Sequence, residues 1–375
     1  MINGVFDIVL MLLILVALVV VHEFGHFATA RLFKVRVHEF GIGFPPRAKV
    51  LGRDSETVYT LNWLPLGGFV RLEGEEGDSD DPRSFVRQPL SKRVVILLAG
   101  VVMNLLLAFL LLWGIAAFAD PTVGVRVSCV QPGSPAEQAG LVSGPVTRTT
   151  PEGVAVCGDS GYTILAVDGE RFSWFDAPAG IPDGILRDLR TKLGQTVSLT
   201  VQAPDGSVTE RSATLRSGDA ATQGALGIGV GGLPVGEGII ARDPISAIGV
   251  GVDRTVKAGT LILDGLRQLV TNLANPPVSG PIGIVQTVGV VRAEFPPVFL
   301  VYLVALLSAN LAVVNALPFP PMDGGRLAVS VIQAISGNRV SLAAERAVYL
   351  TGFVLLMALL VWISFFDIQR LGGGT

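Results

Sequence analysis

The sequence predicts a polytopic α-helical membrane protein with four transmembrane helices, a membrane-associated β-hairpin region and one β-rich domain outside the membrane. Half of the 375 residues are apolar and only 16% are charged, against about 25% in an average soluble domain. Four apolar stretches each reach about 20 residues with their flanks, which is enough helix to cross the ~30 Å hydrocarbon core. Between them lie two segments rich in strand-forming residues, glycine and proline.

The four predicted transmembrane helices are nearly unbroken apolar runs. A removable signal peptide is the alternative for the first run, because Ala28-Thr29-Ala30 resembles a cleavage site. Signal peptides begin with a positive charge, whereas residues 1–21 contain no Lys or Arg. The sequence therefore favours a helix that stays in the protein. The predicted helices lie at 1–27, 94–118, 298–326 and 347–366.

Positive charges in the short loops predict the orientation of these helices. Basic residues cluster at 31–36, just after the first helix, and at 92–93, just before the second. Because cytoplasmic loops carry the excess of Lys and Arg, the loop that holds both clusters is predicted to be cytoplasmic, with both chain ends outside. The predicted segments are a membrane-associated β-region at 28–93, an extracytoplasmic β-rich domain at 119–243, an outer segment at 244–297, a cytoplasmic connection at 327–346 and a tail at 367–375.

Both non-helical segments have strand composition. The inner one reads as a small cytoplasmic hairpin or, alternatively, as a β-element that dips towards the membrane. In the outer one, Ser134 and Pro135 predict the cap and first residue of a short helix. Strands are predicted at Val58–Leu61, Phe69–Leu72, Val123–Val130, Thr163–Val167 and Val197–Val201.

Residues 245–270 have the periodicity of a helix without the composition of a transmembrane span. Apolar residues recur at spacings of mostly three or four, and five charged residues interrupt them. Because charges inside a bilayer are costly, we expect an amphipathic helix that lies in the outer membrane interface.

A metal-binding pattern ends the first predicted helix. His22 and His26 are four residues apart, so both imidazoles project from one face of a helix. Two such imidazoles can bind one zinc ion, while Glu23 between them acts as general base on the attacking water. Ionisable side chains at membrane depth are costly and usually functional. The alternative is a polar cluster where the helix emerges into water.

A catalytic zinc site usually has three protein ligands and one open position. The third histidine of the chain, His38, lies beyond the membrane end of the helix and is predicted to be a surface residue. Asp323 is the leading candidate, because the predicted topology places the inner ends of the first and third helices on the same side. Prolines unwind the chain there, which is tolerated where the backbone is buried or lines a cavity. The alternative role for Asp323 is to cap the following helix.

These motifs resemble those of the site-2 protease family of intramembrane zinc metalloproteases, within it the bacterial regulator-of-sigma-E protease group in a form with one PDZ domain. The resemblance covers almost the whole chain and is most specific in H-E-F-G-H at 22–26 and N-A-L-P-F-P-P-M-D-G at 315–324. Further similar segments are the glycine-rich start of the family's β-loop at 41–44, the segment before the third helix at 279–283, and the PDZ signature at 132–141, 158–159 and 167–169.

The resemblance implies that His22, His26 and Asp323 bind one zinc ion per chain and that Glu23 is the catalytic base. It places Asn315 near the scissile peptide, as a donor to the substrate; an interhelical hydrogen bond is the alternative. Substrate contacts are implied for Gly41 and Gly43 in the β-loop and for Val123, Gly124 and Val125 in the PDZ-like domain.

The activity that the resemblance implies is cleavage of single-span proteins, such as anti-sigma factors or remnant signal peptides, in the bacterial inner (cytoplasmic) membrane. Expected partners are a transmembrane substrate, a peptide or C-terminus at the PDZ-like domain, and lipid. The net charge of −3 gives no sign of nucleic-acid binding. A catalytically inactive, membrane-anchored PDZ adaptor is the alternative, although decay would be expected to remove Glu23 or a ligand first. A peptidase for soluble peptides would hold its motif in a soluble domain, and a transporter would be expected to show an internal repeat.

Cys129 and Cys157 are the only cysteines, and both fall in the domain that is predicted to lie outside, where disulfides persist. Cys157 lies near the end of an insertion that interrupts the PDZ signature between Leu141 and Gly158. A bridge that closes this loop of about 29 residues would stabilise the domain by ~3 kcal/mol in the chain-entropy model. The alternative is two unrelated small residues.

Overall fold

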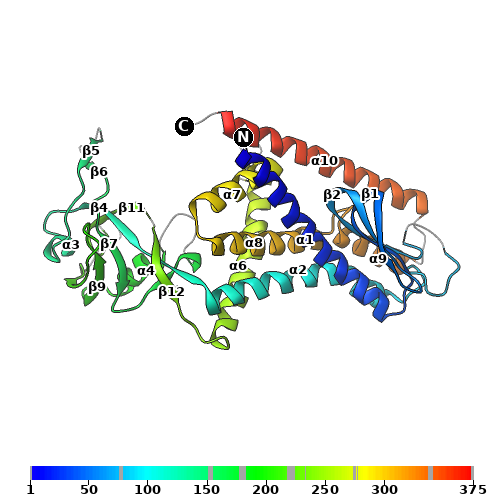
Figure 1. The fold of residues 1–375 in the computed structure, drawn as a ribbon, viewed down its shortest axis with the longest axis horizontal. Helices are drawn as coiled ribbons and strands as arrows, with labels where there is room; N and C mark the ends of the chain where they lie inside the picture. Colours follow the sequence, from blue (N-terminus) through cyan, green and yellow to red (C-terminus); the bar gives the residue numbers. More distant parts are fainter. Residues whose placement is uncertain are drawn as a thin grey trace. The chain divides into compact units, whose positions relative to one another are not determined.

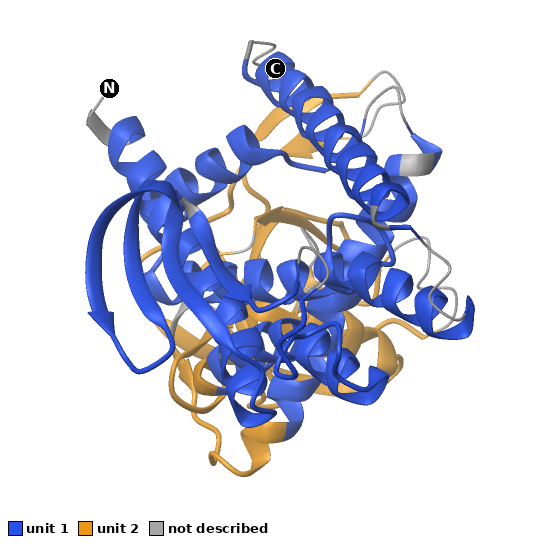
Figure 2. Ribbon diagram, turned by 90° about the vertical axis from the view of Figure 1, so that its right-hand side faces the viewer, with its two compact units in different colours: residues 1–113, 249–375 blue, residues 114–248 orange. Residues whose placement is uncertain are grey.

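The computed structural model (Figure 1) divides the chain into two compact units. Unit 1 comprises Met1–Trp113 and Gly249–Thr375, and unit 2 comprises Gly114–Ile248 (Figure 2). Parts of the predicted connection (337–340) and of the predicted tail (373–375) lie outside the described residues. The described residues are 2–75, 79–150, 155–176, 183–217, 224–232, 234–272, 276, 278–336 and 341–372.

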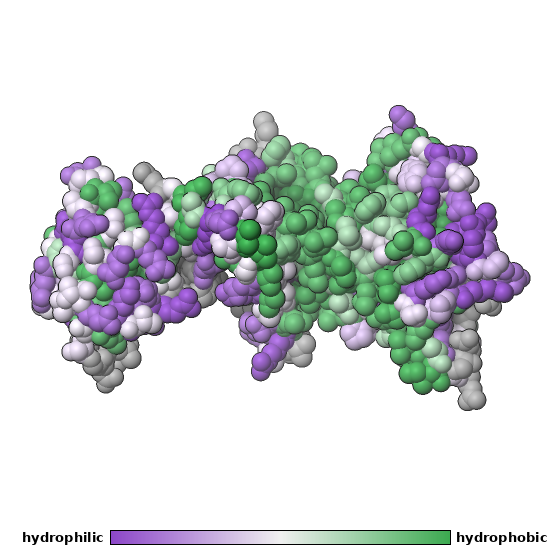
Figure 3. Space-filling view, turned by 90° about the horizontal axis from the view of Figure 1, so that it is seen from below, coloured by the Kyte–Doolittle hydropathy of each residue, from purple (hydrophilic) through white to green (hydrophobic). Residues whose placement is uncertain are grey.

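Among the described residues, four helices are long and apolar enough to cross a membrane, which confirms the predicted number. Large apolar side chains such as Leu13 and Val361 are more than 60% exposed on them. An apolar surface of this kind requires a partner that is itself apolar, and lipid supplies one. Figure 3 shows apolar residues over the middle of unit 1 and polar residues at the end where α9 lies in Figure 1. The helices are α1 (Ile2–Leu32), α2 (Leu90–Phe118), α8 (Pro297–Ala316) and α10 (Leu342–Gly372).

A twisted sheet follows α1 in unit 1 (Figure 2). It consists of β1 (Val37–Arg53) and β2 (Val58–Leu72). Residues 39–42 of β1 have partners on both sides, at 58–61 and at 68–71. The two short strands predicted here are therefore parts of one long strand that folds around β1. Its second part is an open edge, because no other described strand pairs with it.

Unit 2 is built around a five-stranded sheet in the order β10-β9-β7-β4-β11. Val125, Ile164 and Leu199 from this sheet are fully buried against Ile185 and Leu189 of a helix, which supplies the core predicted for a β-rich domain. A second sheet has the order β12-β3-β8, and β5 pairs with β6. The strands are β3 (Asp120–Val123), β4 (Val125–Val130), β5 (Val146–Thr149), β6 (Ala155–Cys157), β7 (Thr163–Val167), β8 (Phe172–Ser173), β9 (Thr196–Gln202), β10 (Val208–Thr214), β11 (Ile228–Gly232) and β12 (Val235–Ile240). The helices are α3 (Pro135–Gln138), the 3-10 turn η1 (Trp174–Asp176) and α4 (Asp183–Thr191).

Local sequence signals in unit 2 were mostly reliable. Ser134 caps α3 by accepting a hydrogen bond from the backbone N–H of Glu137, and Pro135 is the first helical residue, as predicted. The strand predicted at Val123–Val130 is wrong in one respect, because it breaks at Gly124. The Gly124 N–H donates to the Pro234 carbonyl oxygen at 3.1 Å, and the chain passes from one sheet into the other there.

The structure joins Cys129, at the end of β4, to Cys157, at the end of β6, with their Cα atoms 5.2 Å apart. The bond connects the β5–β6 hairpin to the five-stranded sheet. It is the arrangement that the two cysteines were expected to make, with the hairpin as the insertion in the domain.

The predicted amphipathic segment forms α6 (Ser246–Thr271), which crosses α2 and α8 steeply (Figure 1). Small residues make the crossing. Ala258 is buried with Ala108 and Ala309, and a Cβ on Gly251 would lie 2.9 Å from the Cβ of Trp113. Several of the larger apolar side chains of α6, such as Val256 and Leu261, remain exposed. Small residues let helix backbones approach closely, so α6 is packed against α2 and α8.

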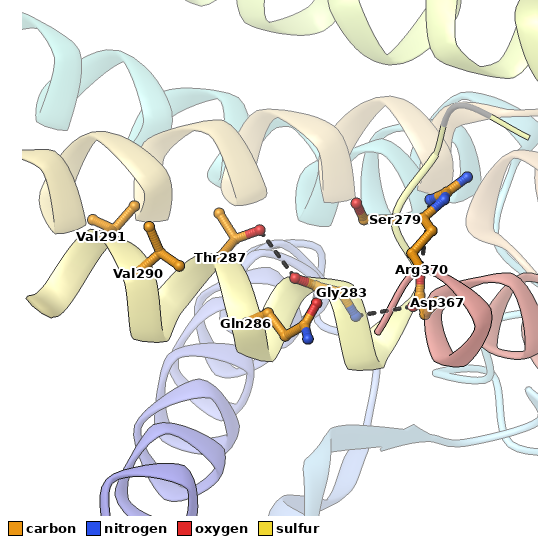
Figure 4. Close-up of a pocket in the computed structure, with 8 residues that line it drawn as sticks. All are labelled: Ser279, Gly283, Gln286, Thr287, Val290, Val291, Asp367 and Arg370. Carbon is orange, nitrogen blue, oxygen red and sulfur yellow. Dashed lines mark hydrogen bonds and ion pairs between the residues drawn. The ribbon is translucent and has the colours of Figure 1, made fainter. Parts of the chain in front are cut away.

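The segment before α8 forms another helix, α7 (Pro281–Glu294), which is fixed at both ends. The Asp367 carboxylate of α10 accepts hydrogen bonds from the backbone N–H groups of Gly280 (3.2 Å) and Gly283 (2.9 Å), beside a cleft of about 330 Å³ (Figure 4). At the other end, Arg292 forms an ion pair with Asp7 of α1 at 2.7 Å. The helix α7 therefore connects the N-terminal end of α1 to the C-terminal end of α10.

Candidate active site

Two histidines of α1 and one aspartate from the other end of the chain meet in unit 1. His22 and His26 are buried, with 5% and 8% of their surface exposed. The Oδ2 atom of Asp323 lies 2.8 Å from Nε2 of His22 and 3.2 Å from Nε2 of His26. The two Nε2 atoms are 3.2 Å apart. Among the described residues, this is the one convergent group of three or more His, Cys, Asp or Glu side chains.

The three side chains fit a zinc ion. Zinc bonds of about 2.0–2.2 Å to nitrogen and oxygen at tetrahedral angles separate neighbouring ligand atoms by about 3.3–3.5 Å. The three distances of 2.8–3.2 Å in the cluster are shorter than this spacing by about 0.1–0.7 Å. Two imidazoles and one carboxylate are also a known ligand set of catalytic zinc sites. We conclude that small rotations of these three side chains would bring their ligand atoms to the spacing that a zinc ion requires.

Asp323 reaches the histidines because the chain unwinds after α8. That helix ends at Ala316, and the proline-containing stretch 317–322 leads to Asp323, the first residue of α9 (Asp323–Ser336). Two glycines make the turn possible: a Cβ on Gly324 would lie 2.3 Å from the Ala316 carbonyl oxygen, and one on Gly325 would lie 2.5 Å from the Pro320 nitrogen. The Asp323 carboxylate contacts both imidazoles and no backbone N–H of a described residue, unlike a helix cap.

Close packing of α1 on α2 completes the walls of the site. A Cβ on Gly25 would lie 2.4 Å from the Ala99 carbonyl oxygen, and one on Gly100 would lie 2.5 Å from Nε2 of His26. His26 Nδ1 donates a hydrogen bond to the Ile96 carbonyl oxygen at 2.8 Å. Gly25 and Gly100 were not among the residues predicted to form the site. The signal that could have found them is a glycine inside an apolar helix, which often marks a helix contact.

A family model described as peptidase family M50 matches residues 10–359. The chain belongs to peptidase family M50. Three bacterial relatives that carry the printed name "putative zinc metalloprotease" resemble this M50 chain over nearly their full length. They come from Clostridium perfringens (31% identical, 96% of this chain, 98% of the relative), Nostoc sp. (32%, 93% and 92%) and Brucella suis (28%, 95% and 93%). The resemblance inferred from the motifs is confirmed, and the chain is a zinc metalloprotease with helices suited to a membrane.

Glu23, the predicted base of this M50 protease, has a carboxylate without a hydrogen-bonding or ion-pair partner among the described residues. A Cβ on Gly68, at the open edge of the β1–β2 sheet, would lie 3.7 Å from the Glu23 Cγ. Glu23 therefore lies between the metal-binding cluster and an unpaired strand edge.

Asn315 lies half-buried in the last turn of α8, and its side chain forms no hydrogen bond with another described residue. His38 is partly exposed, as predicted, and its Nε2 lies 2.5 Å from Glu73 Oε2. Hydrogen bonds from Ser79 and His38 lower the pKa of the Glu73 carboxyl.

The glycines Gly41 and Gly43 have structural reasons to be glycine. A Cβ on Gly41 would lie 2.4 Å from the Phe69 ring, and Gly43 has a φ of +79° with the Leu64 carbonyl oxygen 2.8 Å from its ideal Cβ position. Gly41 also has strand partners on both sides. The open edge beside Glu23 belongs to the second part of β2 instead.

The predicted ligand-contacting residues of unit 2 lie in its interior. Val123 and Val125 are 1% and 0% exposed, and a Cβ on Gly124 would lie 2.6 Å from Thr163 Cγ2. Strand β4 lies between β7 and β11, so an added peptide strand has no edge to pair with there. On this side of the sheet, β11 is the edge strand.

Gly100→Ala is expected to remove most of the bound zinc, because its methyl group would occupy the space of the two imidazole Nε2 atoms. Gly114→Ala in the same helix is the matched control, since nothing lies within 4 Å of its ideal Cβ position. Both changes raise helix propensity equally. Zinc per chain after purification is the measurement, and full occupancy in Gly100→Ala would contradict the assignment of this pocket.

Proposed function

We propose that this M50 protease cuts single-span membrane proteins within the bilayer, with His22, His26 and Asp323 holding one zinc ion. The observation that carries the proposal is the position of the cluster. Its two histidines lie in the half of the apolar helix α1 that follows the most apolar run of that helix, and none of its members lies in unit 2. A substrate must therefore bring its peptide bond to membrane-embedded side chains.

The residues have distinct roles in peptide hydrolysis. Bound zinc would supply a Lewis acid that polarises the scissile carbonyl group and acidifies the attacking water. The free Glu23 carboxylate takes a proton from that water and passes it to the leaving nitrogen. Asn315, whose amide has no partner among the described residues, lies at the end of α8 and donates to the developing oxyanion.

The open edge of β2 supplies a means of holding the substrate. An extended peptide can add to an exposed strand edge through main-chain hydrogen bonds, and the edge at Gly68 lies beside Glu23. A substrate that pairs there presents an extended backbone to the site. We propose this edge, rather than Gly41 or Gly43, as the place where the substrate binds.

The orientation proposed for the chain has the metal-binding cluster near the cytoplasmic side and unit 2 outside, in a bacterial cytoplasmic membrane. Two observations support it: the basic residues between α1 and α2, and the bonded cysteines of unit 2, since disulfides persist outside the cytoplasm. We assign unit 2 as the PDZ-like domain, with the edge strand β11 as the position for a peptide or C-terminus.

An inactive adaptor is the second candidate function, and the convergence of both histidines with Asp323 beside a free Glu23 argues against it. The proposal predicts that cleavage depends on how easily the substrate helix unwinds. Gly or Pro near the scissile bond of a model single-span substrate should raise the initial rate several-fold, because such residues disfavour helix. A run of Leu and Ala should lower it.

The rate is measured with purified protease and substrate in detergent or vesicles. The matched control places the same Gly or Pro two helical turns from the scissile bond, where it should change the rate little. Rates that do not vary across the series would contradict intramembrane cleavage. Equal cleavage of the same sequence as a soluble peptide would contradict it as well.

A further inference from the structure

Asn104 of α2 is a buried polar residue beside the metal-binding cluster. Its side chain is 0% exposed, and its Nδ2 atom lies 3.3 Å from Nδ1 of His22. Its Oδ1 atom is buried and has no hydrogen-bond partner among the described residues. Buried amide oxygens are normally hydrogen-bonded, so this unpaired acceptor next to an imidazole nitrogen calls for a physical reason.

Rotation of the carboxamide gives the oxygen a partner in exchange for the amide nitrogen. Turning the Asn104 amide by 180° exchanges Oδ1 and Nδ2, which are nearly the same size. The oxygen then faces His22 Nδ1 and accepts a hydrogen bond from its N–H. A proton held on Nδ1 leaves Nε2 of His22 with a free lone pair, and Nε2 is the atom that lies 2.8 Å from Asp323.

The second histidine already has the equivalent contact. His26 Nδ1 donates to the Ile96 carbonyl oxygen, which leaves its Nε2 for the metal. Ile96, Gly100 and Asn104 are spaced four apart and therefore share one face of α2. On this face, the Ile96 carbonyl oxygen accepts from His26 and the rotated Asn104 amide accepts from His22. Gly100, between them, leaves room for the two imidazoles.

The position of Asn104 is itself fixed from a third helix. Ser308 of α8 is fully buried, and its Oγ donates to the backbone carbonyl oxygen of Asn104 at 2.8 Å. The same turn of α2 thus contacts His22 on α1 and Ser308 on α8. These contacts hold this turn of α2 beside α1 and α8.

Resting on the zinc site proposed above, we propose that Asn104 is a positioning residue that accepts the Nδ1 proton of His22 and so directs its Nε2 at the metal. Acceptors of this kind orient metal-binding histidines and raise their basicity, and their loss typically weakens metal binding by about 10–100-fold. Packing between helices is the competing role for a buried asparagine.

The test measures zinc affinity of the full-length protein in detergent, by competition with a chelator. Asn104→Leu keeps the volume and removes the acceptor, so its zinc dissociation constant should rise about 10–100-fold. Asn104→Asp keeps an acceptor and should bind zinc within a few-fold of wild type. Asn310→Leu is the matched control, because Asn310 is a membrane-helix asparagine with a buried unpaired Oδ1 outside the cluster; its affinity should not change.

Two results would overturn the role of Asn104. One is a wild-type zinc affinity in Asn104→Leu. The other is an equal loss in Asn104→Asp and Asn104→Leu, which would indicate packing. Asp323→Ala, measured in parallel, separates this inference from the site itself. If Asp323→Ala loses zinc and Asn104→Leu does not, the metal site stands and only the role of Asn104 is refuted. If Asp323→Ala retains zinc, the proposed metal site itself is refuted.

Discussion

Glu23→Gln is expected to lower the cleavage rate by about 10²–10⁴-fold, the usual contribution of a general base, while zinc stays bound. The amide has the shape of the carboxylate but cannot take the proton from the attacking water. Because Glu23 has no partner among the described residues, the change should remove chemistry without disturbing packing. The measurement is kcat on a single-span substrate, together with zinc per chain.

Glu294→Gln is a suitable control for this change. Glu294 is exposed at the end of α7, away from the cluster, so the variant should cleave at the wild-type rate. Near-normal cleavage by Glu23→Gln would remove Glu23 as the base. Loss of zinc from Glu23→Gln would instead make Glu23 part of the metal site.

Asp323→Ala is expected to abolish both zinc retention and cleavage, because it leaves two ligands where a catalytic site usually has three. Zinc content after purification and after mild chelation is the measurement. His38→Ala is the matched control, since His38 is the remaining histidine and contacts Glu73 instead of the cluster. It should keep one zinc per chain.

A full complement of zinc in Asp323→Ala would move the third ligand elsewhere. Glu39 and Glu73 are the carboxylates that the sequence would next suggest. In the structure, each of these carboxylates has other partners. Glu39 contacts Arg47 and Arg71, and Glu73 contacts His38. Asp323 therefore remains the carboxylate that can converge with His22 and His26.

The parts of the site that sequence could predict are those set by local spacing or by the order of the helices. His22 and His26 share a face because they are four residues apart. Asp323 could be assigned because the predicted topology placed the inner ends of the first and third helices on the same side. Gly25 and Gly100 could not be assigned, because their importance depends on the distance between two helix backbones, and periodicity along one helix carries no such distance.

Long-range pairing limited the prediction of the fold in the same way. Strand propensity located β7 and β9 to within a residue. It could not show that residues 39–42 have strand partners on both sides, nor that β11 rather than β4 lies at the edge of its sheet. Hydrogen bonds that join distant residues, such as Asp367 to Gly283, leave no local pattern in the sequence.

The separation of His22 and Asp323 by 301 residues has a consequence for the life of the nascent chain. At about 5–20 residues per second, synthesis of the intervening chain takes roughly 15–60 s. During that time the histidines of α1 have been made and Asp323 has not. The complete set of ligands exists only after the β1–β2 sheet and unit 2 have been translated, so the growing polypeptide spends most of its synthesis without an assembled proteolytic centre.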